Sequence, residues 1–233
     1  MHSASTEALL GRVAGRLAAE LDFHLARTEP VDPGRPHNNR LVHLWSHDGR
    51  EAVLKIYYRD ERHRLDREYT ALHFLNSRGM AEVPMALLRD DRLGCAVYSF
   101  ERGTCRFGPE LTSTDVETIA AFAAALHRIH PETPGAEFRT GVAATFSLAD
   151  QVAAIRRRLS WFTEFACSPS AFPMVRALCA EIDVQTAIEH LIDLALRGAT
   201  DSVVPRERWS LTMGDFAPHN ILIRDDGSIR VLD

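Results

Sequence analysis

Apolar residues in the first hundred positions recur with two different periods. Residues 5–21 form an Ala- and Leu-rich amphipathic pattern, and residues 62–77 repeat apolar positions at intervals of three and four, so both segments predict helices. The short apolar runs that predict strands cover residues 23–26, 41–45, 51–57, 83–88 and 95–100. Asp48-Gly49 between two of these runs predicts a hairpin turn. Strands, one helix and further strands are typical of a small sheet with a packed helix.

The pattern then becomes helical. One apolar stripe at helical spacing consists of Val116, Ile119, Phe122, Leu126 and Ile129. Thr114 and Glu117 predict a capping box at the start of this helix. Ser147 and Asp150 predict the start of a second helix, and residues 172–197 predict one or two more.

The change of pattern near residues 100–103 divides the chain into two predicted parts. A chain of 233 residues is long enough for one large domain or two small lobes. We therefore predict an α+β fold in which residues 1–100 form a sheet-containing lobe. Residues 101–233 form a mainly helical lobe.

Composition narrows the classes of partner. The net charge of −5 gives no reason to expect a nucleic-acid partner, and no apolar run is long enough to span a membrane. The N-terminus has no basic segment leading into an apolar core, so we expect no signal peptide. The four cysteines include no Cys-x-x-Cys pair, which favours free thiols and a reducing, cytoplasmic location. None of this predicts an oligomeric state.

The most informative segment begins at Met213 and ends at Asp233. Asp215 and Asn220 are five residues apart, and Asp233 lies thirteen residues further on, after two short apolar runs around an Asp-Asp-Gly turn signal. A loop followed by a hairpin can aim these three side chains at one point. One carboxylate can then accept a proton from a substrate hydroxyl, while an amide oxygen and a second carboxylate bind Mg²⁺. This is a layout for phosphoryl transfer.

A second candidate site lies in the N-terminal part. Lys55 interrupts an apolar strand, and a buried ammonium is costly unless it meets an anion. Glu68 flanks the apolar face of the following helix, so a Lys–Glu pair would direct the lysine toward nucleotide phosphates. The alternative is a lysine that reaches water from an edge strand and a glutamate paired with Arg64 on its own helix.

Two further segments are candidates for nucleotide contact. Ser99, Phe100 and Glu101 follow a strand at the predicted junction, where backbone groups can read the edge of an adenine; the alternative is a plain linker. Asn38 and Asn39 precede another strand and are either nucleotide contacts or turn residues.

Together these motifs resemble the aminoglycoside phosphotransferase and choline kinase family, which has a protein-kinase-like fold. The similarity covers nearly the whole chain, and Asp215-x-x-Pro218-x-Asn220 with the closing Asp233 is its most specific part. The resemblance implies MgATP as phosphate donor, Asp215 as base, Asn220 and Asp233 as metal ligands, and Lys55 on the phosphates. Met213 departs from the pattern, because the family usually has histidine there.

The resemblance implies ATP-dependent phosphorylation of a hydroxyl group on a small molecule. Met213 and the end of the sequence at Asp233 favour an alternative, a nucleotide-binding pseudokinase or regulatory module. A protein kinase is a third possibility, against which no arginine precedes Asp215. Because the resembling family continues beyond this aspartate, we also expect the chain to be a truncated fragment with little or no kinase activity.

Overall fold

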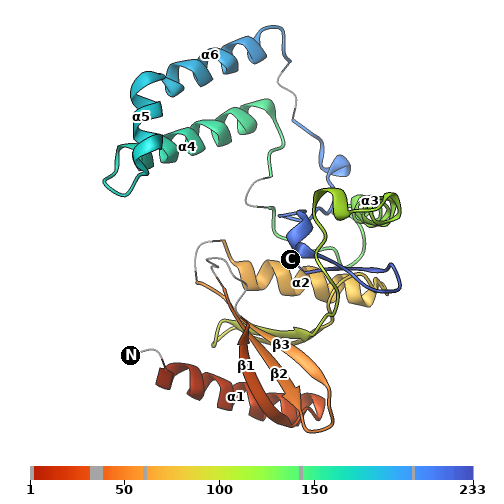
Figure 1. The fold of residues 1–233 in the computed structure, drawn as a ribbon. Helices are drawn as coiled ribbons and strands as arrows, with labels where there is room; N and C mark the ends of the chain where they lie inside the picture. The colour runs from red at the N-terminus through yellow and green to blue at the C-terminus, as the bar shows by residue number, and fades with distance from the viewer. Residues whose placement is uncertain (1–2, 32–38, 60–61, 142–143, 201–202, 233) are drawn as a thin grey trace. The chain divides into compact units, whose positions relative to one another are not determined.

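The computed structural model describes residues 3–31, 39–59, 62–141, 144–200 and 203–232. The chain forms two compact units, which are described separately (Figure 1). Unit 1 combines residues 1–139 with residues 210–233, and unit 2 consists of residues 140–209.

Unit 1 contains a five-stranded antiparallel sheet with the strand order β1-β2-β3-β5-β4. Its strands are β1 (Leu25–Val31), β2 (Arg40–Ser46), β3 (Glu51–Ile56), β4 (Ala86–Asp90) and β5 (Cys95–Ser99). In β2, buried side chains alternate with less buried ones, and β3 does the same until Leu54 and Lys55, which point to opposite faces and are both buried.

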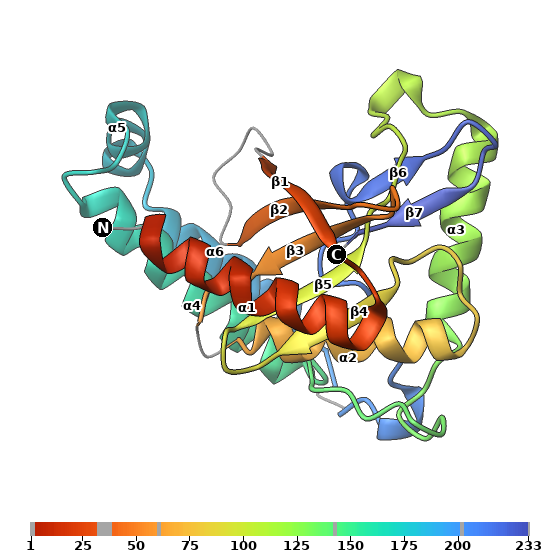
Figure 2. The same cartoon turned by 90° about the horizontal axis from the view of Figure 1, so that it is seen from below.

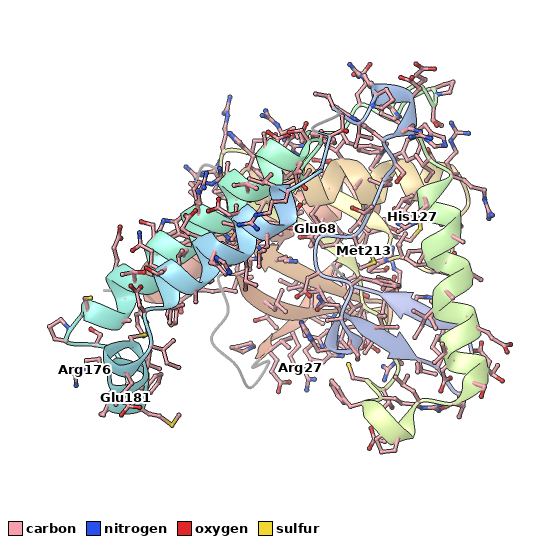
Figure 3. The ribbon with its side chains drawn as sticks, turned by 90° about the horizontal axis from the view of Figure 1, so that it is seen from above. Arg27, Glu68, His127, Arg176, Glu181 and Met213 are labelled. Atoms are coloured by element: carbon pink, nitrogen blue, oxygen red, sulfur yellow. The ribbon has the colours of Figure 1, made fainter. Side chains whose placement is uncertain are left out.

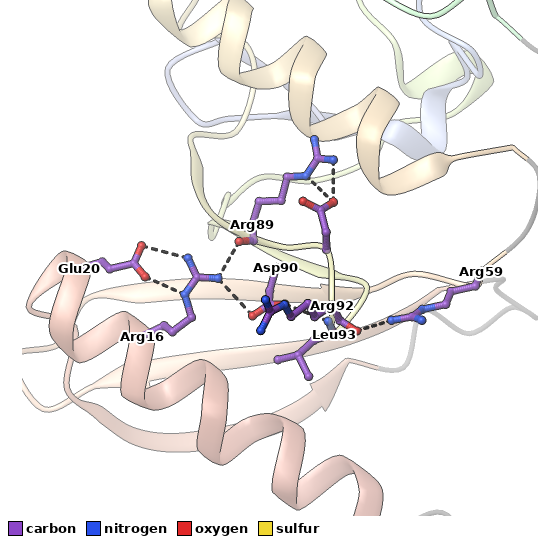
Figure 4. Close-up of polar contacts among 8 residues, drawn as sticks. Arg16, Glu20, Arg59, Arg89, Asp90, Arg92 and Leu93 are labelled. Atoms are coloured by element: carbon purple, nitrogen blue, oxygen red, sulfur yellow. Dashed lines mark hydrogen bonds and ion pairs between the residues drawn. The ribbon is translucent and has the colours of Figure 1, made fainter.

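Helix α1 (Ser3–Leu21) lies across one face of the sheet (Figure 2). Val13 and Leu17 of this helix are buried in one cluster with Leu44 of β2 and Leu54 of β3. Arg16 on the same helix bonds Glu20 and reaches Asp90 at the end of β4, with an Nη1–Oδ2 distance of 3.2 Å (Figure 4). Apolar packing and this ion pair together attach α1 to the sheet.

The other face of the sheet carries α2 (Arg64–Ser77) and a second apolar cluster. Leu72 and Phe74 of α2 pack in this cluster with Tyr98 of β5. Helix α3 (Ser113–His127) and the hairpin of β6 (Ile221–Ile223) and β7 (Ile229–Val231) contribute to the same cluster. The C-terminal hairpin and the sheet therefore share one core, although more than a hundred residues separate them.

Unit 2 contains three helices in its described part. They are α4 (Leu148–Cys167), α5 (Pro173–Glu181) and α6 (Val184–Leu196). Arg156 of α4 makes a bidentate ion pair with Glu189 of α6, with a shortest distance of 2.7 Å. Short 3₁₀ turns occur at Gly108–Glu110 and Pro218–Asn220 in unit 1 and at Arg206–Arg208 in unit 2. Among the described residues, no helix has both the length and the apolar composition needed to cross a membrane.

Most predicted elements are present, with several differences in detail, and the strand predicted at residues 83–88 covers Ala86–Asp90. The first strand covers Leu25–Val31 rather than residues 23–26, because its pairing with β2 continues to Val31. The predicted cap of α3 is wrong by two residues: Thr112 accepts a hydrogen bond from the Asp115 amide, and Asp115 bonds the Thr112 amide in return. Val116, which was predicted to belong to the apolar stripe of this helix, is exposed. The predicted cap of α4 at Ser147 is confirmed.

Candidate active site

Lys55 and Glu68 form a bidentate ion pair between β3 and α2. The Lys55 Nζ atom lies 2.9 Å from Glu68 Oε1 and 2.7 Å from Oε2. The two side chains are 11% and 12% exposed, so water screens their interaction only weakly. Figure 3 labels Glu68 on α2. Lys55 is also the only lysine among the 27 lysine and arginine residues of the chain.

The segment after β5 is fixed by its side chains. Ser99 Oγ accepts a hydrogen bond from the Met85 amide and donates one of 2.6 Å to Glu101. Arg230 of β7 makes an ion pair of 3.0 Å with the same carboxylate. The side chain of Glu101 thus connects this segment to β7.

Phe100 packs on the sheet. Its ring stacks on His43 of β2 with a centroid separation of 3.8 Å and an interplanar angle of 7°. His43 in turn donates a hydrogen bond of 2.8 Å from its Nε2 atom to the Glu51 carboxylate. The ring of Phe100 therefore orients the backbone of the linker that follows β5.

Gly103 allows the linker to approach the C-terminal hairpin closely. Its φ of +152° is one that other residues rarely adopt, and a Cβ atom there would lie 2.8 Å from the Cβ of Leu222. Thr104 and Ile223 then exchange two backbone hydrogen bonds of 2.9 Å. These contacts place the linker beside the strand that follows Asn220.

One residue predicted to contact the nucleotide, Asn39, lies just before β2. Asn39 accepts a hydrogen bond of 3.3 Å from the Tyr58 amide through its Oδ1 atom, so it connects the start of β2 to the end of β3. Asn38 lies outside the described residues. Nucleotide contact by Asn39 remains a prediction.

The loop from Met213 to Asn220 has an ordered internal geometry. The Asn220 Nδ2 atom donates a hydrogen bond of 3.0 Å to the Asp215 carbonyl, and the Asn220 amide bonds Ala217 at 2.9 Å. His219 Nε2 lies 3.2 Å from Asp215 Oδ2, and the Asp215 side chain is 62% exposed. The carboxylate of Asp215 is thus accessible, while its backbone is held by Asn220.

Met213 occupies a partly buried position against the core shared by α2 and α3 (Figure 3). An apolar side chain suits this environment, because the loop is held there by packing. The predicted metal ligand Asp233 lies outside the described residues. The preceding residue, Leu232, donates a backbone hydrogen bond of 2.9 Å to the Asn220 carbonyl, so the end of the hairpin runs beside Asn220.

The structure adds residues that the sequence did not identify. His43 and Arg230 hold the linker through Phe100 and Glu101. Two tyrosines, Tyr57 and Tyr98, lie next to the Lys55–Glu68 pair. Tyr57 is two positions after Lys55 and therefore on the same face of the sheet. This spacing is the sequence feature from which its position near Lys55 could have been predicted.

Comparison with protein families gives a match over residues 31–233 to the model described as the phosphotransferase enzyme family. The chain belongs to this family. The family resemblance derived from the motifs is therefore confirmed. No curated protein matches the sequence at a significant level.

Solved structures confirm the predicted protein-kinase-like fold. The spectinomycin phosphotransferase APH(9)-Ia, in complex with ADP and spectinomycin, matches with a TM-score of 0.63 and 16% identity over 96% of this chain and 68% of its own. The macrolide 2'-phosphotransferase MphH from Brachybacterium faecium has a TM-score of 0.57 and 22% identity, over 97% and 71%. The choline kinase LicA from Streptococcus pneumoniae has a TM-score of 0.54 and 15% identity, over 97% and 68%.

Proposed function

We propose that this protein transfers the γ-phosphoryl group of MgATP to a hydroxyl group of a small molecule. Membership of the phosphotransferase family supports this function. The spectinomycin phosphotransferase structure contains ADP, which supports an adenine nucleotide as the donor's product. The Lys55–Glu68 ion pair is the observation that carries the proposal, because Glu68 holds the largely buried ammonium of the chain's single lysine in one position on the sheet.

Lys55 binds the phosphates of the nucleotide in this proposal, and Glu68 holds Lys55 in place. An ammonium is a compact charge with three donors, which suits phosphate oxygens. The backbone at Ser99, Phe100 and Glu101 contacts the nucleotide base, because the side chains of this linker are engaged elsewhere. Asn39 would contribute a contact from the start of β2.

Asn220 and Asp233 are the proposed ligands of Mg²⁺. The Asn220 Nδ2 atom donates a hydrogen bond to the Asp215 carbonyl. The side-chain amide oxygen is therefore the atom of Asn220 that can coordinate the ion. An amide oxygen and a carboxylate form the hard oxygen set that Mg²⁺ prefers. The bound ion would neutralise charge on the transferred phosphoryl group.

Asp215 accepts the proton of the substrate hydroxyl. The hydroxyl oxygen forms a bond to the γ-phosphorus, the bond between that phosphorus and the bridging oxygen breaks, and ADP leaves with the electron pair. The exposed carboxylate of Asp215 can approach a substrate, whereas its backbone is fixed by Asn220.

Asp183, Glu189 and Asp193 place negative charge at the start and along the length of α6, and such charge could bind a cationic substrate. However, Asp183 caps this helix by accepting a hydrogen bond from the Thr186 amide, and Glu189 pairs with Arg156. Two of the carboxylates thus have structural partners, and we propose no particular substrate from this face. We propose a cytoplasmic location, from the free cysteines and the sequence composition.

The proposal is tested by incubating the protein with MgATP and a panel of aminoglycosides, choline-like alcohols, sugars and homoserine. Mass spectrometry of the mixtures should detect ADP together with one phosphorylated compound. Asp215→Asn should abolish this product, whereas Asp225→Asn, in the turn after β6, should not. Binding of MgATP without any product would favour the pseudokinase alternative. Absence of MgATP binding would contradict the proposed function.

A further inference from the structure

Two tyrosine hydroxyls meet in the core beside the Lys55–Glu68 ion pair. The Tyr57 and Tyr98 hydroxyl oxygens are 2.7 Å apart, and the two residues are 6% and 4% exposed. Tyr57 follows β3 directly, and its amide bonds the Gly94 carbonyl at 2.9 Å. The rings are therefore held by their strands, and their hydroxyl groups are withdrawn from water.

The hydrogen atoms of these two hydroxyl groups require a further acceptor. Each phenol has one proton, so only one of the two can donate to the other, and the second must donate elsewhere. The Glu68 carboxylate is the acceptor available to Tyr57, because its charge and, more weakly, a side-chain hydrogen bond both act on the Tyr57 hydroxyl. A carboxylate accepts and does not donate, so the order of donation is Tyr98 to Tyr57 and Tyr57 to Glu68.

Burial raises the pKa of Tyr57, and the neighbouring carboxylate of Glu68 acts in the same direction. The Tyr57 hydroxyl therefore stays protonated and remains a donor at any physiological pH. A buried hydrogen bond to a charged acceptor is stronger than a neutral one, because little water competes for it.

Glu68 thus receives hydrogen bonds from two directions. Lys55 contacts both carboxylate oxygens, and Tyr57 contacts the same carboxylate from within the core. The Lys55 Nζ atom also lies 5.4 Å from the centre of the Tyr57 ring, within reach of a cation–π interaction. The tyrosines restrict the rotation of Glu68, and Glu68 restricts the position of Lys55.

We propose that Tyr57 and Tyr98 are positioning residues that act on Lys55 through Glu68. This inference rests on the proposed function, in which Lys55 binds nucleotide phosphates. It attributes the effect to the hydroxyl groups. If the two rings served only as apolar packing, phenylalanine at either position would keep the ring and leave Lys55 unaffected.

The single lysine of the chain makes Lys55 directly measurable. An amine-acylating reagent can modify only Lys55 and the α-amino group, and mass spectrometry separates the two sites. Protection of Lys55 by increasing MgATP gives an apparent dissociation constant without any need for turnover. We would compare wild type with Tyr57→Phe and Tyr98→Phe, using the exposed Tyr58→Phe as the control.

The concentration of MgATP that gives half-maximal protection should rise about 2- to 10-fold in Tyr57→Phe, the range expected for one lost hydrogen bond. Tyr98→Phe should show a smaller rise, and Tyr58→Phe none. In a Glu68→Ala background, which removes the acceptor, Tyr57→Phe should add nothing further. Without nucleotide, Lys55 should be acylated faster in Tyr57→Phe than in Tyr58→Phe, because Glu68 holds it less firmly.

Unchanged protection and acylation in both phenylalanine variants would overturn the inference. A full additional effect of Tyr57→Phe in the Glu68→Ala background would also overturn it, because the hydroxyl would then act independently of Glu68. If MgATP fails to protect Lys55 in wild type, the proposed function is contradicted. The acylation rates without nucleotide then still decide whether the tyrosines position Lys55.

Discussion

At the scale of single residues, charge type and burial determine what each candidate can do. The chain has one lysine and uses arginine at its other permanently cationic side chains, and that lysine is among the least exposed charged residues described. Arginine cannot replace it easily, because its planar fork is larger and requires a different arrangement of acceptors. The Lys55 position is therefore the most sensitive test of a phosphate contact.

Lys55→Ala should weaken MgATP binding about 10- to 100-fold, the range for a lost hydrogen bond to a charged group. Glu68→Ala should produce a milder loss, because the ammonium remains but is less well placed. Isothermal titration calorimetry measures both effects, with Arg12→Ala on the exposed side of α1 as the control. Equal affinity in Lys55→Ala and wild type would remove Lys55 from the nucleotide site.

The cysteines provide a second test at this scale. Burial raises the pKa of the Cys95 thiol to about 11, whereas Cys167 is exposed. Because the thiolate is the reactive form, Cys95 should resist iodoacetamide at pH 8 and Cys167 should react. Reactivity at Cys95 should increase as the pH approaches 11 if the fold persists. Rapid alkylation of Cys95 at pH 8, read by peptide mass spectrometry, would contradict the burial of β5.

At the scale of elements, ion pairs and close backbone contacts fix the segments that carry the site. Asp66 in the first turn of α2 bonds Arg139 at 2.6 Å and Arg89 of β4 at 3.0 Å. The hydrogen bond from Arg139 is the main reason that the pKa of Asp66 is lowered. These contacts hold the start of the helix that carries Glu68.

Asp66→Asn should lower stability at neutral pH by at most about 1 kcal/mol, because the side chain is partly exposed. The folded-state pKa of Asp66 is depressed, so its ion pairs stabilise the fold above the unfolded pKa of about 3.9. This contribution is lost as the pH falls through the folded-state pKa. Melting temperatures should therefore differ at pH 7 and converge in acid. A difference that persists in acid, or one matched by Asp225→Asn, would contradict this assignment.

Gly103→Ala should destabilise the protein by about 1–3 kcal/mol, because alanine disfavours this φ and its Cβ would meet Leu222 and Ile223. Gly11→Ala in α1 is the matched control: nothing lies within 4 Å of the added Cβ. Alanine at that helical position should stabilise by about 0.5–1 kcal/mol. Chemical denaturation measures both changes. Equal effects of the two substitutions would mean that the linker does not approach the hairpin as described.

Local patterns predicted most elements but not their side-chain partners. The predicted cap of α3 was Thr114 with Glu117, but Thr112 and Asp115 cap the helix. Asp115 also pairs with Arg106, a contact that depends on the tertiary fold and leaves no local signal in the sequence. The role of the Glu101 side chain was missed for a similar reason, because its partner Arg230 is more than a hundred residues away.

At the scale of the whole molecule, the family and the fold were predictable from the spacing of a few polar residues. The resemblance to phosphotransferases rested on Asp215, Asn220 and Asp233, with Lys55 and Glu68 in the expected order. The grouping of the hairpin with the sheet was not predictable, since it depends on a shared core. The proposed lobe boundary near residues 100–103 stays a prediction.

The roles of Asp215 and Lys55 together form the central claim, and they predict different defects. Asp215 moves a proton and makes no required contact with the nucleotide, whereas Lys55 binds the phosphates. Asparagine at position 215 keeps the shape of the side chain but is a very poor base. Its effect should therefore fall on turnover and leave nucleotide affinity nearly unchanged.

The most direct measurement compares wild type and Asp215→Asn for phosphoryl transfer and for MgATP affinity in the same preparations. Transfer to the substrate identified by the panel should fall about 10²- to 10⁴-fold in the variant, as expected for loss of a general base. The dissociation constant for MgATP should remain within about twofold of wild type, a difference of less than 0.5 kcal/mol. Retention of most of the turnover by Asp215→Asn would contradict the account.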